Sequence, residues 1–161
     1  MKTLSIKSLA LAGAVVAASW LSSTAVGVAQ EVTLRLHQFL PAQANVPKLV
    51  LDKWADDVEA DSNGRIKVER YPSMQLGGTP PQLMDQAIDG TVDVVWTVVG
   101  YTPGRFPRVE VFELPFMMTN AGATSRAYWD LFEKEMKDTD FQDVHIVGTW
   151  VHGPGMFHTK D

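Results

Sequence analysis

Cysteine is absent from the 161-residue sequence. A chain without cysteine cannot form disulfides, so its folded state must be held together by its hydrophobic core. Clusters of Lys and Arg are also missing, and the formal net charge is -5. Nucleic-acid binding is therefore not expected, because a phosphate backbone requires such clusters of positive charge. Internal repeats and low-complexity segments are absent as well, and the remaining composition is that of an ordinary globular protein.

The first 29 residues have the pattern of a secretory signal peptide. Lys2 and Lys7 provide a basic start, residues 9–21 are apolar or small, and Gly27-Val28-Ala29 offers small side chains to a signal peptidase. The apolar run is shorter than the roughly 20 residues that span a bilayer, and an uncleaved anchor is the alternative. We predict cleavage after Ala29 and export to a periplasm. The formal net charge then moves from -5 to -7, because two lysines and no acidic residue are removed.

The rest of the chain alternates between two hydrophobic patterns. Period-two alternation or runs of β-branched residues predict strands at 32–37, 65–71, 91–99 and 145–151. Apolar residues at helical spacing predict helices at 47–61, 80–89 and 121–137. The segment 91–99 is β-branched almost throughout, which is typical of a strand that is buried on both faces of a parallel sheet.

This order of strands and helices predicts an α/β fold with a mostly parallel sheet and helices on both of its faces. Ligands of open α/β sheets bind beyond the carboxyl ends of the strands. The loops after His37, Tyr71, Trp96 and Trp150 are therefore the segments where we expect a binding site.

Signals for catalysis or metal binding are weak. His37, His145, His152 and His158 include no pair at helical i, i+4 spacing, and a hydrogen-bonded structural histidine is the ordinary expectation for a strand. His152 is the exception, because it follows a strand end and precedes a Gly-Pro-Gly turn. The sequence has no G-x-S-x-G motif. We expect no metal and no cofactor.

Aromatic residues at the predicted strand ends are more informative. Trp96 lies in the most apolar strand, Tyr101 in the loop after it, and Trp150 near the end of the last strand. Each of them could simply pack in the core. Their shared position at one edge of the sheet instead predicts an aromatic-lined cleft, which suits a binding site better than a reaction centre.

Several motifs together resemble the solute-binding proteins of tripartite ATP-independent periplasmic (TRAP) transporters, the DctP family. The resemblance runs from about Val32 to the end of the sequence. It is carried by Ser62-x-Gly64-Arg65-Ile66-x-Val68, Tyr71-Pro72, Gln75-Leu76-Gly77-Gly78, Ala87-Ile88-x-Gly90-Thr91-Val92-Asp93, Phe106-Pro107 and Glu113-Leu114-Pro115-Phe116. The segments 100–107 and 152–158 suggest a subgroup within that family.

The resemblance implies a periplasmic-binding-protein-like fold of type II, in which two α/β domains close over an organic acid. Residues 30–151 would form domain I, and residues 152–161 would begin the crossover to a domain II that the sequence does not include. The family also implies a monomer that delivers its ligand to membrane permease subunits. The arginine that pairs with the ligand carboxylate lies in the absent part, and no arginine follows Arg126 here.

We predict a ligand-binding site that combines aromatic residues with a few polar groups. Its expected members are Gln38, Phe39, Trp96, Thr97, Tyr101, Trp150 and His152. The aromatic content favours a carboxylate ligand that carries a ring. One alternative is an exported hydrolase or isomerase that uses His152 as its base, and another is the binding protein of an ATP-driven transporter.

Overall fold

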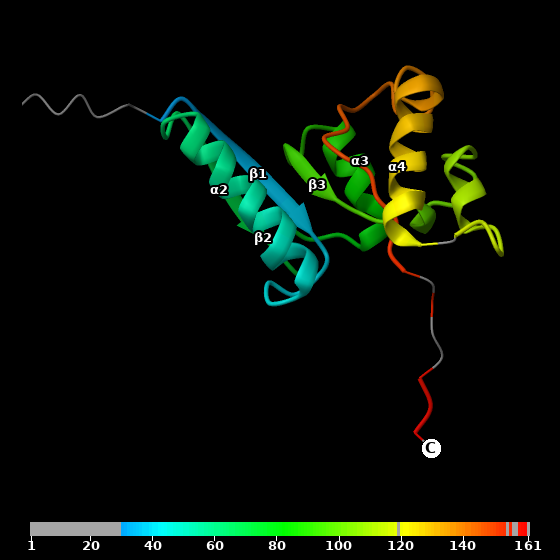
Figure 1. Cartoon of the computed structure of the whole chain (residues 1–161). Coiled ribbons are helices and arrows are strands. Elements are labelled where there is room, and N and C mark those ends of the chain that lie inside the picture. Colours follow the sequence, from blue (N-terminus) through cyan, green and yellow to red (C-terminus); the bar gives the residue numbers. More distant parts are fainter. Residues whose placement is uncertain (1–29, 119, 154, 156–157, 161) are drawn as a thin grey trace, which may run out of the picture.

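The protein consists of a three-stranded parallel sheet with helices around it (Figure 1). The structure is a computed structural model, and it describes residues 30–118, 120–153, 155 and 158–160. The strands follow the order β2-β1-β3. They are β1 (Val32–Gln38), β2 (Ile66–Tyr71) and β3 (Val94–Trp96). The predicted signal peptide lies outside the described residues. Within the described part of the chain, no helix is long and apolar enough to cross a bilayer.

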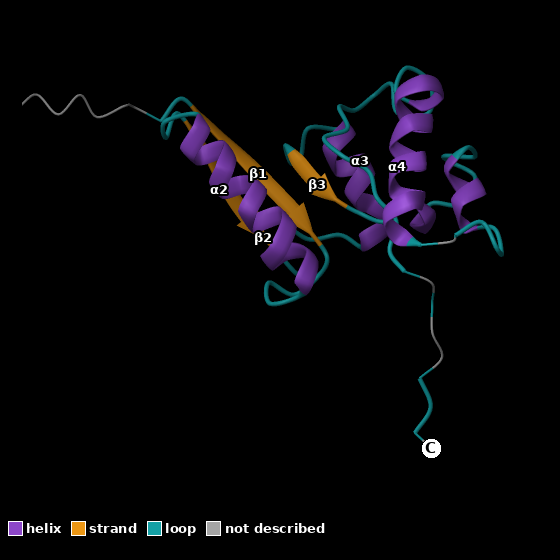
Figure 2. Ribbon diagram, viewed as in Figure 1, coloured by secondary structure: helices purple, strands orange, loops and turns teal. Residues whose placement is uncertain are grey.

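Helical segments follow each strand (Figure 2). The α-helices are α2 (Asp52–Asp61), α3 (Leu83–Ile88) and α4 (Ala121–Leu131). The shorter helical turns are η2 (Pro47–Leu51), η3 (Pro80–Gln82), η4 (Val99–Tyr101), η5 (Val109–Glu113) and η6 (Phe132–Met136). The three helices predicted from the sequence are confirmed, each as an α-helix joined to one of these turns.

Helix α2 covers one face of the sheet and ends where the sequence predicts. Its Ala55 is fully buried against Leu36 of β1 and Val68 of β2. After its last residue the backbone enters the left-handed region at Asn63 (φ 54°) and Gly64 (φ 77°). Gly64 adopts this conformation without a Cβ clash, which explains why the helix stops there.

Helix α3 lies on the opposite face, as the side chains of β1 show. Successive side chains of a strand point to opposite faces. Leu36 belongs to the core under α2, whereas His37 is hydrogen-bonded through Nδ1 to Oε1 of Gln86 in α3, at 2.8 Å. The prediction of helices on both faces of a parallel sheet is therefore confirmed.

Two carboxylates fix the strands by accepting backbone hydrogen bonds. Glu59 accepts from Val68 N–H at 2.9 Å, and Asp93 accepts from Arg35 N–H at 2.8 Å. These hydrogen bonds lower the pKa of each carboxyl, helped by Lys67 near Glu59 and by the guanidinium of Arg35 near Asp93. Both carboxylates stabilise the fold in their ionised form, so this contribution is lost as the pH falls through the lowered pKa.

A second hydrophobic core lies under α4, apart from the core under α2. Its buried residues are Met84, Phe106, Val109, Tyr128, Phe132, Met136 and Phe141. The Asn120 side chain caps α4 by accepting from Ala123 N–H at 2.8 Å. Burial, together with the charge of Glu113, raises the pKa of Tyr128 to about 12. Its hydroxyl is buried without a hydrogen-bond partner among the described residues, and this marks the interior under α4 as strongly apolar.

Two strand predictions were wrong. The strand expected at 91–99 is only Val94–Trp96, and its residues are half-buried rather than buried on both faces. Among the described residues, β3 is paired with β1 alone, so its other edge has no strand. The segment 145–151 is not a strand, since no described strand is paired with it and its Val151 N–H is bonded to a side chain of α4.

The turn between β2 and α3 is organised around buried His37. His37 accepts a hydrogen bond at Nε2 from Leu76 N–H, at 3.3 Å, so its Nδ1 carries the proton that is donated to Gln86. Gln86 in turn donates to the carbonyl of Gly77 at 3.1 Å. The expectation of a structural histidine in this strand is confirmed for His37.

Replacing His37 with alanine should destabilise the protein without unfolding it. The change leaves Leu76 N–H and Oε1 of Gln86 without partners and opens a cavity, which together cost about 2–4 kcal/mol. Urea denaturation measures the loss, and His145→Ala is the matched control because His145 is exposed. Equal unfolding midpoints for the two variants would contradict the role assigned to His37.

Candidate functional site

Four aromatic side chains meet at the carboxyl end of the sheet. Phe39 stacks on Trp96 with ring centroids 5.0 Å apart and lies 5.5 Å from the ring of Tyr101. Trp96 also faces Trp150, with centroids 6.3 Å apart and ring planes only 20° from parallel. We call these four residues the aromatic cluster. The sequence predicts that all four line one cleft, and the structure brings them together.

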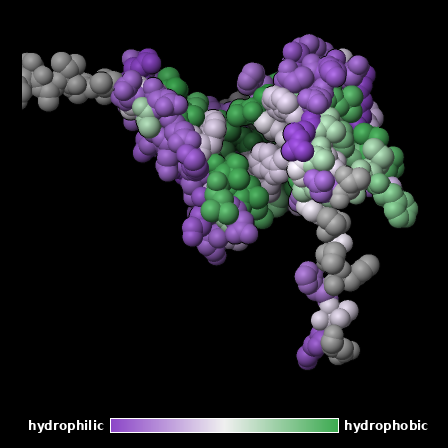
Figure 3. Space-filling model, in the orientation of Figure 1, coloured by the Kyte–Doolittle hydropathy of each residue, from purple (hydrophilic) through white to green (hydrophobic). Residues whose placement is uncertain are grey.

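The aromatic cluster lies where the two hydrophobic cores meet. Phe39 directly follows β1 and Trp96 is the last residue of β3, so both extend from strand ends. Trp96 packs against the core under α2, whereas Val151, the neighbour of Trp150, packs against the core under α4. In Figure 3 the surface is hollowed between the parts that carry α2 and α4, and hydrophobic residues lie in and beside this hollow.

The rings of the aromatic cluster are only partly covered. Tyr101 is 42% exposed and Trp150 is 40% exposed, while Phe39 and Trp96 are half-buried. Aromatic rings exposed to this extent can take up further apolar contact from a ligand.

Gln38, a predicted hydrogen-bonding residue of the site, has a structural contact instead. Only 3% of Gln38 is exposed, and its side-chain amide both donates to the carbonyl of Leu40, at 2.8 Å, and accepts from Leu40 N–H. Its backbone carbonyl accepts from Met74 N–H at 3.1 Å. Gln38 therefore holds the backbone on both sides of Phe39, and its role toward a ligand stays a prediction.

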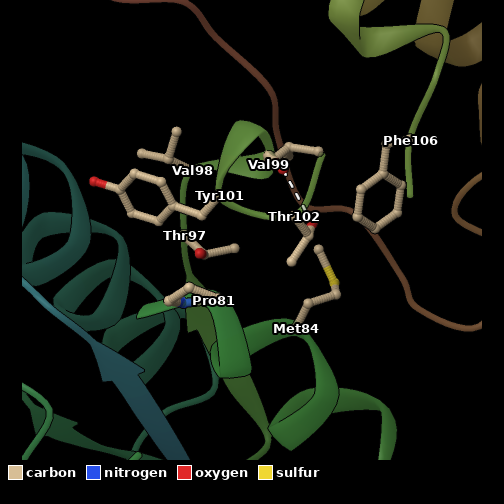
Figure 4. Close-up of a pocket in the computed structure, with 8 residues that line it drawn as sticks. All are labelled: Pro81, Met84, Thr97, Val98, Val99, Tyr101, Thr102 and Phe106. Atoms are coloured by element: carbon tan, nitrogen blue, oxygen red, sulfur yellow. Dashed lines mark hydrogen bonds between the residues drawn. The ribbon is translucent and has the colours of Figure 1, made fainter. Parts of the chain in front are cut away.

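Thr97 and Tyr101 lie at a narrow space between η4 and α3 (Figure 4). The hydroxyl of Thr97 donates to the carbonyl of Pro80 at 3.4 Å. The figure shows the rings of Tyr101 and Phe106 on opposite sides of Val99 and Thr102. This space is too narrow for a water molecule, so it is a packing contact that supports Tyr101 rather than the place of a ligand.

A larger cavity of about 320 Å³ lies next to η4. Its lining includes the acidic side chains of Glu110 and Glu113 beside Val99, Phe106 and Leu114. Two carboxylates repel an anion, so an organic acid is better accommodated at the aromatic cluster.

His152, the predicted polar residue that the enzyme alternative requires as a base, is exposed. Its Nδ1 lies 2.5 Å from the carbonyl oxygen of its neighbour Gly153. No hydrogen bond or ring contact joins His152 to the aromatic cluster among the described residues. No group of three or more His, Cys, Asp or Glu side chains in the described part of the chain could hold a metal ion.

The positive charges of the described residues are mostly paired. The arginines in ion pairs with carboxylates are Arg35, Arg65, Arg70, Arg105 and Arg108. Arg126, exposed on α4, has no ion-pair partner among the described residues. None of these side chains makes a described contact with the aromatic cluster, so no guanidinium is placed there to pair with a ligand carboxylate.

Ser125 of α4 was not recognised from the sequence. Its hydroxyl accepts from Val151 N–H at 3.0 Å and lies 3.4 Å from the carbonyl oxygen of the same residue, to which it can donate. A serine inside a predicted helix carries no signal that it will contact a segment 26 residues later. Only the three-dimensional structure reveals this contact beside Trp150.

Comparison with known proteins yields a consistent set of relatives. The family described as bacterial extracellular solute-binding protein, family 7 (DctP) matches residues 37–161. A TRAP solute-binding protein from Rhodoferax ferrireducens T118, crystallised with copurified benzoate, is 56% identical with a TM-score of 0.75, over 80% of this chain and 40% of that chain. A marine metagenome TRAP solute-binding protein from an unidentified microbe, specific for aromatic acid ligands and bound to metahydroxyphenylacetate, is 51% identical with a TM-score of 0.74, over 77% of this chain and 39% of that chain.

A curated relative covers the same part of the chain. The outer membrane transporter protein TsaT of Comamonas testosteroni is 28% identical over 134 residues, which are 82% of this chain and 39% of TsaT. This chain thus spans about 40% of the length of the relatives that it matches. The family match includes every residue of the aromatic cluster, and it confirms the resemblance drawn from the sequence motifs. The chain therefore belongs to the DctP family of bacterial extracellular solute-binding proteins.

Proposed function

We propose that this chain supplies one side of the ligand cleft of a TRAP transporter solute-binding protein that captures an aromatic carboxylate. The observation that carries the proposal is the aromatic cluster, whose rings meet at the carboxyl end of a parallel sheet. Ligands of open α/β sheets bind at this end. Partly exposed rings with nearly parallel planes favour a flat apolar ligand over a small and highly polar one.

The relatives support a ligand of this class. The Rhodoferax ferrireducens protein holds benzoate that copurified with it, and the marine metagenome protein is specific for aromatic acids. Both are more than 50% identical to this chain over more than three quarters of its length. A benzoate-like acid is therefore the first ligand to test.

The carboxylate of such a ligand requires a positive charge that the described residues do not place at the aromatic cluster. A guanidinium that binds both carboxylate oxygens is the side chain best suited to this role. We propose that residues 30–151 form one domain, that residues 152–161 lead into a second, and that the second domain supplies this arginine. The second domain would then close the cleft over the ligand.

The same proposal assigns a location and a partner. The leader-like residues 1–29 would direct the protein to the periplasm, where the loaded protein would deliver its ligand to membrane permease subunits. The protein would bind its ligand without transforming it, and it would need no cofactor. Exposed His152, which has no described contact with the aromatic cluster, lends no support to the alternative of a hydrolase or isomerase.

A thermal-shift screen of the full-length protein tests the proposal. Benzoate and 3-hydroxybenzoate should raise the unfolding temperature by several degrees, since a ligand at one hundred times its Kd stabilises by about 2.7 kcal/mol. Succinate, an aliphatic dicarboxylate of similar size, serves as the matched control and should have little effect. Stabilisation by succinate alone would overturn the assignment of an aromatic ligand.

A further inference from the structure

We infer that Ser125 of α4 is a positioning residue for the ligand cleft, because it holds the segment that carries Trp150 against the aromatic cluster. This inference rests on the proposed function of the cleft. Ser125 itself touches no ring of the aromatic cluster in the described contacts. It would act through the backbone of Val151, with which its hydroxyl makes two polar contacts, at 3.0 and 3.4 Å.

The segment around Trp150 needs such an anchor because it belongs to no helix or strand. Residues 145–153 have no secondary structure, and none of the strands of the sheet is paired with them. Besides the ring contact of Trp150 with Trp96, two kinds of described contact hold the segment in place. Ile146 and Val151 pack against the core under α4, and the Ser125 hydroxyl binds Val151 N–H and C=O.

The apolar packing and the Ser125 hydrogen bonds constrain the segment in different ways. Hydrophobic packing is non-directional and leaves a segment free to slide or rotate by a small amount. A hydroxyl that binds both the N–H and the C=O of one residue fixes the orientation of that backbone. Since Trp150 immediately precedes Val151, this orientation determines where the indole points.

The position of Trp150 matters because its ring is nearly parallel to Trp96. The two planes differ by 20° with centroids 6.3 Å apart, and Trp150 is still 40% exposed. Rings held in this arrangement present flat faces, which fit a flat ligand ring better than a puckered one. Loss of the Ser125 contacts should therefore reduce selectivity for an aromatic ring as well as affinity.

The test compares Ser125→Ala with Ser125→Thr in the full-length protein. Calorimetry should show benzoate binding weakened about three- to tenfold in Ser125→Ala, which is the size of one ring contact. Binding of cyclohexanecarboxylate, which has the same carboxylate on a puckered ring, should weaken less. Ser125→Thr keeps the hydroxyl and should restore the benzoate affinity, and Asp130→Asn, an exposed change on the same helix, should have no effect.

Hydrogen exchange gives a readout that needs no ligand. The Val151 amide donates to Ser125, so it should exchange at least about tenfold faster in Ser125→Ala than in the wild type or in Ser125→Thr. The inference would be overturned if the Val151 amide of Ser125→Ala exchanged at the wild-type rate. It would also be overturned if Ser125→Ala kept the wild-type ratio of benzoate affinity to cyclohexanecarboxylate affinity. A wild-type protein that binds neither benzoate nor 3-hydroxybenzoate would overturn the proposed function itself, and the inference with it.

Discussion

Replacing Trp96 with alanine is expected to weaken benzoate binding more than any other single change in the aromatic cluster. Trp96 and Phe39 each face two other rings of the cluster, and the indole of Trp96 is the larger of the two side chains. Removing the indole would take away the ligand contact proposed for it and would free both neighbours to move. Loss of a central aromatic anchor typically costs 2 kcal/mol or more, so the Kd should rise about 30-fold or more.

Isothermal titration calorimetry of the full-length protein measures this effect, and a second tryptophan provides the matched control. Trp129 of α4 is also half-buried, but its ring lies 5.2 Å from Phe132 and outside the aromatic cluster. Trp129→Ala should lower the unfolding temperature and leave the benzoate Kd of the folded protein within about twofold. Trp96→Phe should retain part of the affinity. A Kd for Trp96→Ala equal to that of Trp129→Ala would remove Trp96 from the site.

Local sequence patterns predicted most of the fold around the site. Strand β1 and the two covered faces of the sheet followed from hydrophobic periodicity. The C-terminal end of α2 followed from Gly64, whose left-handed conformation few other residues adopt easily. The failures share one cause. A strand forms only beside another strand, and hydrophobic alternation at 145–151 carries no information about whether a partner exists.

The aromatic part of the site was predictable, whereas its polar part was not. Phe39, Trp96 and Tyr101 end or follow strands of the parallel sheet, so their convergence could be expected. Trp150 also joins them, although the strand predicted to carry it is not present. The burial of Gln38 depends instead on the turn at Ser73 and Met74, where two consecutive residues have positive φ. Serine and methionine do not predict this conformation, because residues other than glycine rarely have a positive φ.

Replacing Phe141 with alanine is expected to cause the largest loss of stability among the changes considered. Phe141 follows η6 in a segment without regular structure, yet it is 2% exposed and central to the core under α4. Its ring stacks on Phe106 at 4.6 Å and meets the edge of Phe132 at 5.7 Å. Removing a buried phenyl ring costs about 3–5 kcal/mol, a large share of the 5–15 kcal/mol typical of a folded domain.

Urea denaturation of Phe141→Ala measures this loss, and Phe39→Ala is the informative comparison. Phe39 is half-buried in the aromatic cluster, so its removal should cost less stability but should weaken benzoate binding about tenfold. Phe141→Ala should cost more stability and weaken benzoate binding less, because Phe141 belongs to the core under α4 and not to the aromatic cluster. The contrary result is a Phe141→Ala variant that keeps its unfolding midpoint but loses as much benzoate affinity as Phe39→Ala. That result would contradict the separation of the core under α4 from the cleft, which the two sets of ring contacts indicate.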